Sequence, residues 1–138
     1  IGGLSKRLDT IIATRAETIF LMIAINDIFG GNDVGYIAGR YEDVVARLKP
    51  HAKVIVQSTL QCSLSFCSDG QRAKVDVLNA ALQKVAKRQG VTFVDLNARF
   101  SPEGSLSPAY TYDGVHLNSA GFALWREMLA PHMPQKAG

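Results

Sequence analysis

The stretch Thr18-Ile-Phe-Leu-Met-Ile-Ala-Ile25 decides the fold class of this 138-residue chain. It is apolar after its first residue, it does not alternate between apolar and polar positions, and it is rich in residues that favour strands. A short run of this kind is typical of a strand covered on both faces, as in a parallel sheet between two layers of helices.

Similar patterns on both sides of this strand predict two more strands and four helices. The remaining strands are rich in β-branched residues, and the helices carry apolar residues at intervals of three and four. In chain order, helix first and then alternating, the expected elements lie near 4–12, 18–25, 34–48, 53–59, 75–86, 91–96 and from 118 or 119 onward. This alternation predicts an α/β fold with a parallel sheet.

Local signals mark several boundaries of these elements. Asp33 is a plausible N-cap, Pro50 follows the second helix, and Gly90 stands at the C′ position of the third. A polar loop is expected at 60–70, and a long Pro/Ser/Gly-rich connection at 97–116. The aromatic residues Phe122 and Trp125 are expected in the core.

Composition excludes several classes of protein. With 47% hydrophobic and 20% charged residues, the chain is expected to fold as a single domain over residues 1–138. Its net charge of +3 comes from scattered Lys and Arg residues without a basic stripe, so we expect no nucleic-acid partner. The longest apolar run, Ile19 to Ile25, is far shorter than the roughly 20 residues of a membrane span.

Ligands of such sheets bind beyond the carboxyl ends of the strands, which directs attention to Asn26. This residue follows the first strand in Ala24-Ile-Asn-Asp27. Its side-chain NH₂ could donate to an oxyanion that forms during acyl transfer. An Asx turn or a helix cap would explain the same residue.

The second candidate feature is Asp113-Gly-Val-His116, near the end of the long connection. An Asp three residues before a His can accept the imidazole Nδ1–H, fix the tautomer and leave Nε2 to act as a base. An ordinary turn is the alternative. Together with Asn26, this pair would supply most of the groups that acyl transfer needs, except the nucleophile.

Three segments resemble the SGNH or GDSL-type hydrolases, most closely the small acetylhydrolase-like branch: Gly2-Gly3, Ala24-Ile-Asn-Asp27 and Asp113-Gly-Val-His-Leu-Asn118. The resemblance implies a three-layer α/β/α sandwich with a parallel, flavodoxin-like sheet. It also implies a serine-dependent hydrolase of short-chain or acetyl esters, including acetylated carbohydrates, without metal or cofactor. By position, Gly3 and Asn26 resemble the family's oxyanion-hole residues, Asp113 the acid that orients the histidine, and His116 the general base.

The chain departs from the family pattern at two places. Ala24 stands where the family's third block has a glycine, and the Gly-Asp-Ser block with the nucleophile is absent. None of the nine serines lies in a comparable setting. We therefore expect the first strands and the nucleophile on polypeptide that precedes Ile1, where the chain begins without a methionine. A non-catalytic carbohydrate- or ligand-binding module of the same fold is the alternative; a nucleotide binder is disfavoured because no Gly-rich phosphate loop follows a strand.

Cys62 and Cys67 form a C-x₄-C loop beyond the second strand. A local disulfide is the first interpretation and would fit a secreted or periplasmic protein. A catalytic cysteine activated by His116 is the alternative. Zinc is disfavoured because no further Cys or His pair is nearby. His51 and His132 are expected at the surface.

Overall fold

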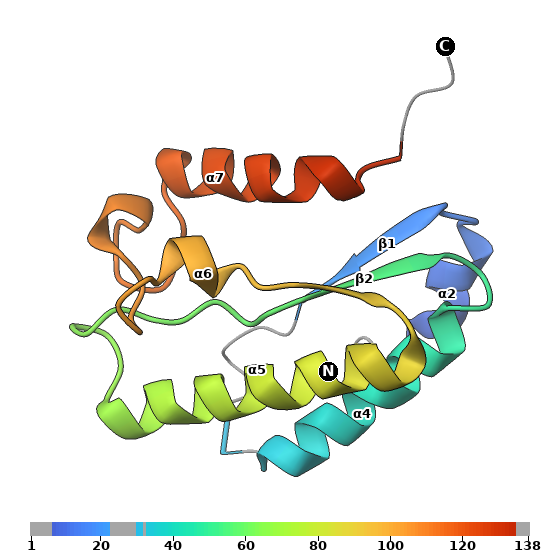
Figure 1. The fold of residues 1–138 in the computed structure, drawn as a ribbon, viewed down its shortest axis with the longest axis horizontal. Coiled ribbons are helices and arrows are strands. Elements are labelled where there is room, and N and C mark those ends of the chain that lie inside the picture. Colours follow the sequence, from blue (N-terminus) through green and yellow to red (C-terminus); the bar gives the residue numbers. More distant parts are fainter. Residues whose placement is uncertain (1–6, 23–29, 32, 135–138) are drawn as a thin grey trace.

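The structure is a computed structural model that describes residues 7–22, 30–31 and 33–134. Three strands alternate with helices, as the sequence predicts (Figure 1). The elements are α2 (Leu8–Ala13), β1 (Thr18–Leu21), α4 (Val34–Leu48), β2 (Lys53–Gln57), α5 (Asp69–Gln89), β3 (Thr92–Val94), α6 (Asn97–Phe100), η1 (Pro108–Tyr110), α7 (Ser119–Leu129) and η2 (Ala130–His132).

The three strands form a parallel sheet in the order β1-β2-β3. Thr18 pairs with Lys53 between the first two strands, and Ile55 with Thr92 between the second two. Helices α4 and α5 cover one face, and α6 and α7 lie on the other (Figure 1). The predicted α/β/α arrangement is therefore confirmed. Within the described residues, β1 pairs with β2 along one edge and with no strand along the other.

Alternation along β2 divides the core into two clusters. Val54 and Val56 pack with the apolar faces of α4 and α5, whereas Ile55 packs with Phe100 and with α7. All three β2 side chains are buried, as expected for a strand covered on both faces. In β1, which lies at the edge of the described sheet, three of four residues remain partly exposed.

The helix boundaries follow from local capping groups. The Asp33 carboxylate accepts the Tyr36 N–H at 3.2 Å, and Ser68 and Gln71 form a capping box at the start of α5. At the other end of α5, Gly90 has a φ of +68°, a backbone conformation that glycine adopts with less strain than a residue with a Cβ. The caps predicted at Asp33 and Gly90 are confirmed, and α5 begins at Asp69, within the segment predicted as loop.

Two predictions about the last third of the chain need correction. The connection after β3 contains α6 and η1, because Phe100 is drawn into the core and the Ser107 side chain caps the 3₁₀ turn. Phe122 is 49% exposed and does not belong to the core. Helix α7 turns Leu124 and Leu129 inward instead, with Trp125 packed partly against them.

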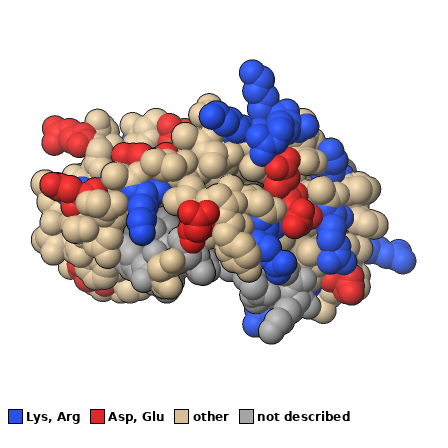
Figure 2. Space-filling model, turned by 90° about the horizontal axis from the view of Figure 1, so that it is seen from below, with Lys and Arg blue, Asp and Glu red and all other residues tan. Residues whose placement is uncertain are grey.

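The face formed by α4 and α5 carries charged side chains of both signs (Figure 2). Seen from the side of α4 and α5, Lys and Arg gather mainly toward one end of the molecule, with acidic side chains among them (Figure 2). No helix in the described part of the chain has the length and hydropathy to cross a bilayer.

Candidate functional site

The Asp113–His116 pair lies between η1 and α7. The segment that joins these two elements lies at the end of the sheet toward which the strands run (Figure 1). His116 Nδ1 lies 2.5 Å from Asp113 Oδ2. The other carboxylate oxygen, Oδ1, accepts the backbone N–H groups of Val115 and His116 at 2.9 and 2.7 Å. One carboxylate thus fixes both the backbone turn and the imidazole ring, through the Nδ1 contact that the Asp-x-x-His spacing predicts.

Thr111 and Gly114 shape this turn. Thr111 Oγ1 donates to the carbonyl of His116 at 2.5 Å and accepts the Gly114 N–H at 2.9 Å. Gly114 has a φ of +98°, which a residue with a Cβ would adopt only under strain. Thr111 and Leu117 form an antiparallel bridge across the base of the turn.

Hydrogen bonds keep Asp113 ionised. The backbone N–H of His116, then its side chain, then the N–H of Val115 lower the pKa of Asp113 from 3.8 to about 2. The group is therefore a carboxylate at neutral and mildly acidic pH and can accept the Nδ1–H of His116 throughout this range.

The pair is open to solvent on one side. The side chain of His116 is 68% exposed and that of Asp113 is 35% exposed. Tyr112 stacks on the His116 ring with centroids 6.0 Å apart and is itself 72% exposed. Tyr110 packs edge-on against Phe100 and so joins the connection to the core.

Cys62 and Cys67 are joined in a disulfide. The predicted pairing is confirmed. The alternative of a cysteine nucleophile is wrong for this oxidised form, because neither sulfur is present as a thiol or thiolate. The loop lies beyond β2, and its Ser63 N–H donates to the carbonyl of Gly114 at 2.8 Å. The two motifs, separate in the sequence, are thus in contact.

Within the described part of the chain, no serine side chain makes a hydrogen bond to His116. Ser58 is buried and accepts the Leu96 N–H, Ser68 caps α5, and Ser101 donates to Asn97. Ser63 and Ser65 bond to one another at 2.9 Å. None of these hydrogen bonds involves His116.

The two predicted oxyanion residues, Gly3 and Asn26, lie outside the described residues. Strand β1, which precedes Asn26 in the sequence, is linked to α7 through Gln57 of β2, which is 2% exposed. Its amide donates to the Leu21 carbonyl at 3.4 Å, and its oxygen accepts the Trp125 indole N–H at 2.7 Å. This link between β1, β2 and α7 was not predicted from the sequence, although Gln57 is a polar residue at the end of a buried strand, which is a signal for such a bond.

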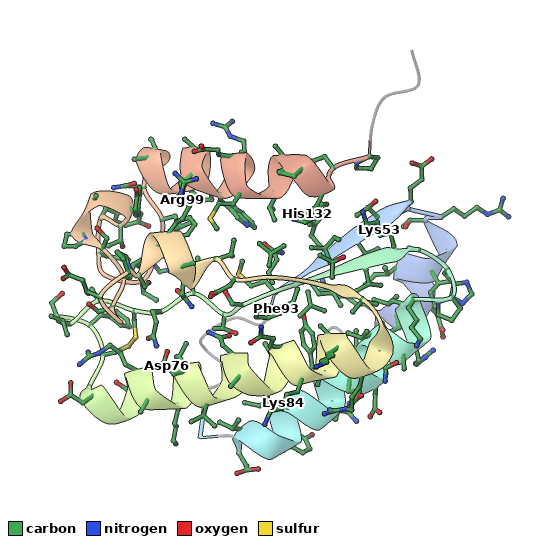
Figure 3. The ribbon with its side chains drawn as sticks, in the orientation of Figure 1. Lys53, Asp76, Lys84, Phe93, Arg99 and His132 are labelled. Carbon is green, nitrogen blue, oxygen red and sulfur yellow. A yellow bond between two sulfur atoms is a disulfide. The ribbon has the colours of Figure 1, made fainter. Side chains whose placement is uncertain are left out.

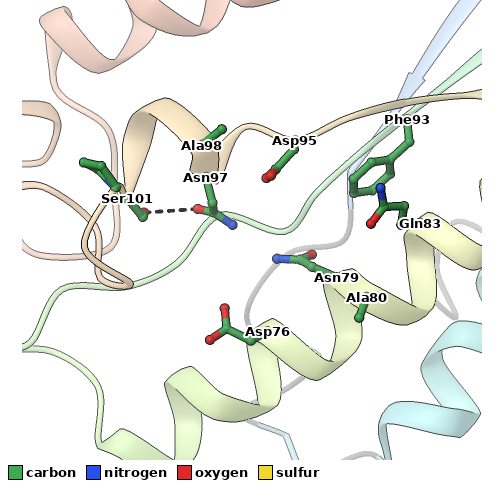
Figure 4. A pocket seen from close by; sticks show the side chains of 10 residues that line it. Asp76, Asn79, Ala80, Gln83, Phe93, Asp95, Asn97, Ala98 and Ser101 are labelled. Carbon is green, nitrogen blue, oxygen red and sulfur yellow. Dashed lines mark hydrogen bonds between the residues drawn. The ribbon is translucent and has the colours of Figure 1, made fainter.

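A polar cleft of about 440 Å³ lies elsewhere, between α5 and the segment after β3 (Figure 4). Asp76 and Asn79 on α5 face Asp95 and Asn97 across it, and Asn97 accepts from Ser101. Neither Asp113 nor His116 lines this cleft, and no histidine does. Among the described residues, no cluster of three metal-binding side chains exists.

The remaining histidines stand apart from the pair. His51 is exposed and follows α4, at the amino end of β2. His132 is half-buried and lies just after the carboxyl end of α7 (Figure 3). His116 precedes the amino end of the same helix.

Comparison with known proteins supplies the family. Residues 2–124 match the model of the GDSL-like lipase/acylhydrolase family. The chain belongs to this family. No curated protein sequence matches the chain.

Solved structures of GDSL-type hydrolases share the fold. An acylhydrolase from Bacteroides fragilis is 27% identical with a TM-score of 0.80, over 94% of this chain and 66% of that one. A GDSL-like lipase from Bacteroides thetaiotaomicron is 23% identical with a TM-score of 0.82, over 94% and 67%. An acetylxylan esterase from Geobacillus stearothermophilus is 21% identical with a TM-score of 0.78, over 97% and 67%. The chain thus spans about two thirds of the length of each protein.

Proposed function

We propose that this chain is the larger part of a serine-dependent hydrolase of short-chain and acetyl esters, with acetylated carbohydrates as its substrate class. The observation that carries the proposal is the Asp113–His116 pair, with 2.5 Å between Oδ2 and Nδ1. A carboxylate that accepts Nδ1–H leaves Nε2 free to take a proton from a nucleophile. Membership of a hydrolase family supports this assignment.

Gly3 and Asn26 complete the proposed machinery by position in the family pattern. His116 deprotonates the serine, which attacks the ester carbonyl. The Gly3 N–H, the Asn26 side-chain N–H and the serine amide hold the oxyanion of the tetrahedral intermediate. His116 then protonates the leaving alcohol, and water, activated by the same histidine, releases the acid.

We place the nucleophile on polypeptide that precedes Ile1. The sequence has no Gly-Asp-Ser block, and the chain spans about 67% of the length of the GDSL-like lipase it resembles. The edge of β1 that has no strand partner within the described residues would accept the first strands. Catalytic mutants of the Geobacillus acetylxylan esterase replace a serine in one structure and an aspartate in another. This agrees with a serine and Asp113 as partners of His116.

Substrate class and location are part of the same proposal. Two of the structural neighbours are acetyl xylan esterases, which supports acetylated carbohydrate as substrate. The Cys62–Cys67 disulfide supports a secreted or periplasmic setting. We propose no nucleic-acid partner.

Hydrolysis of p-nitrophenyl acetate and of acetylated xylo-oligosaccharides tests the proposal. We expect activity from the chain joined to its preceding segment and none from residues 1–138 alone. His116→Ala should abolish activity, and Asn26→Ala should reduce it by about 10² to 10³. His51→Ala, an exposed histidine at the other end of the sheet, is the matched control.

A non-catalytic binding module is the second candidate, because no serine side chain among the described residues hydrogen-bonds to His116. Such a module would bind acetylated oligosaccharides, measured by calorimetry, without hydrolysing them, even when the preceding segment is present. Wild-type turnover by the Asn26→Ala variant would contradict the oxyanion assignment.

A further inference from the structure

We propose that the loop closed by the Cys62–Cys67 disulfide, residues 62–67, positions the Asp113–His116 pair. This loop is called the cystine loop below. The inference rests on the proposed function and adds positioning residues to it. Its first support is the hydrogen bond from the Ser63 N–H to the carbonyl of Gly114 at 2.8 Å. Gly114 stands between Asp113 and His116, so this bond holds the turn on which both side chains depend.

The second support is a close approach of the two segments. A Cβ at Gly114 would collide with the Ser63 hydroxyl oxygen and would stand 3.0 Å from the Phe66 Cβ. Glycine is therefore required here both by its φ of +98° and by the cystine loop packed against it. A turn in such contact cannot shift toward residues 63–66 without moving them as well.

The third support is that the cystine loop is itself well anchored. Both cysteines are buried, at 0% and 5% exposure. The Cys62 carbonyl accepts the Leu106 N–H at 3.0 Å, and the Cys67 carbonyl accepts the Arg72 guanidinium of α5 at 2.5 Å. The disulfide closes the loop between these two anchors. The loop is thus fixed to α5 on one side and to the long connection on the other.

A solvent-exposed histidine gains most from such support. The His116 side chain is 68% exposed, so core packing does little to hold it. Its position depends on Asp113 and on the backbone of the turn, which the cystine loop fixes from outside. A misplacement of about 1 Å in a catalytic group can cost about 10²-fold in rate. The cystine loop should therefore act on kcat through His116, with little effect on substrate binding.

The test compares Gly114→Ala with Gly104→Ala in the protein that includes the preceding segment. Both glycines lie in the same connection and have positive φ, +98° and +86°, but a Cβ at Gly104 would meet nothing within 4 Å. We expect Gly114→Ala to lower kcat by about 10- to 100-fold with KM within about twofold, and Gly104→Ala to leave kcat within about twofold. Adding Ser63→Ala to Gly114→Ala should restore part of the loss, because it removes the colliding hydroxyl.

Opening the disulfide gives an independent readout. In the Cys62→Ser/Cys67→Ser variant, we expect the NMR signal of the His116 Nδ1–H to broaden or shift, and kcat to fall, while circular dichroism shows a folded protein. If the wild type hydrolyses no ester, the proposed function fails, but the Nδ1–H signal still tests positioning. Equal effects of the two glycine variants, or an unchanged Nδ1–H signal in the double cysteine variant, would overturn the inference.

Discussion

Helices α4 and α5 on one face of the sheet, and α7 on the other, are attached to β2 in different ways. The first face meets β2 through apolar side chains from both layers, and its ion pairs, such as Glu42 with Arg88, lie at the surface. The second face adds a hydrogen bond inside the structure, from the Trp125 indole to Gln57. Helix α5 has directed bonds too, but they lie beyond the end of β2, where Asn79 exchanges two hydrogen bonds with the backbone of Thr59. Along β2 itself the directed bond comes from α7, and it ties the helix that follows His116 to the sheet.

The largest expected effect is on the face covered by α4 and α5. Leu82→Ala on α5 removes a fully buried side chain and should lower the free energy of unfolding by about 2–5 kcal/mol. Leu124→Ala on α7, 5% exposed, should fall toward the lower end of the same range. Urea denaturation measures both. A loss below about 1 kcal/mol for Leu82→Ala would show that this face is not the main source of stability.

The next effect concerns the bond that distinguishes α7. Trp125→Phe removes the indole donor and leaves the Gln57 oxygen buried without its partner, which should cost about 1–3 kcal/mol. Phe122→Leu, at a 49% exposed position on the same helix, is the control and should stay within about 0.5 kcal/mol. If Trp125→Phe and Phe122→Leu cost the same, the contrast between the two faces disappears.

A smaller loss of stability is expected when the N-cap of a helix in either layer is removed. Ser68→Ala at α5 and Asn118→Ala at α7 should each cost about 1 kcal/mol, because each cap accepts a backbone N–H of the first turn. Asn118 also donates to the Ala109 carbonyl at 3.1 Å. Its loss should therefore change the amide NMR shifts of residues 109–117, whereas Ser68→Ala should change those around α5. Identical shift patterns would argue against separate roles.

The smallest effect is the pH dependence of the Asp113 turn. Because the folded-state pKa of Asp113 is about 2 and its ordinary value is 3.8, the carboxylate's stabilising bonds are fully present above pH 3.8. They are lost as the pH falls toward about 2. The side chain is exposed, so we expect local loosening of the turn rather than global unfolding. NMR shifts of the Val115 and His116 amides should follow this titration, and Asp113→Asn should abolish it.

Sequence patterns alone located most of the fold. The runs of apolar residues gave three strands and the principal helices, and Asp33 and Gly90 marked boundaries, because helical periodicity and capping depend on residues only three or four apart. Asp113 and His116 could be paired for the same reason. The short helices α6 and η1 could not be predicted from the sequence. They form within an irregular connection, where Phe100 packs into the core and the Ser107 side chain caps a turn.

By itself, then, the sequence determined the α/β layering, the Asp113–His116 pair and its family resemblance, and the Cys62–Cys67 pairing. Only the tertiary structure decided that Ser63 holds Gly114, that Gln57 joins β1 to α7, and that Phe122 faces solvent. Each of these contacts joins residues far apart in the chain, or depends on which face of a helix meets the sheet. The spacing of residues along the sequence does not predict these contacts, because they form only when the helix layers pack on the sheet.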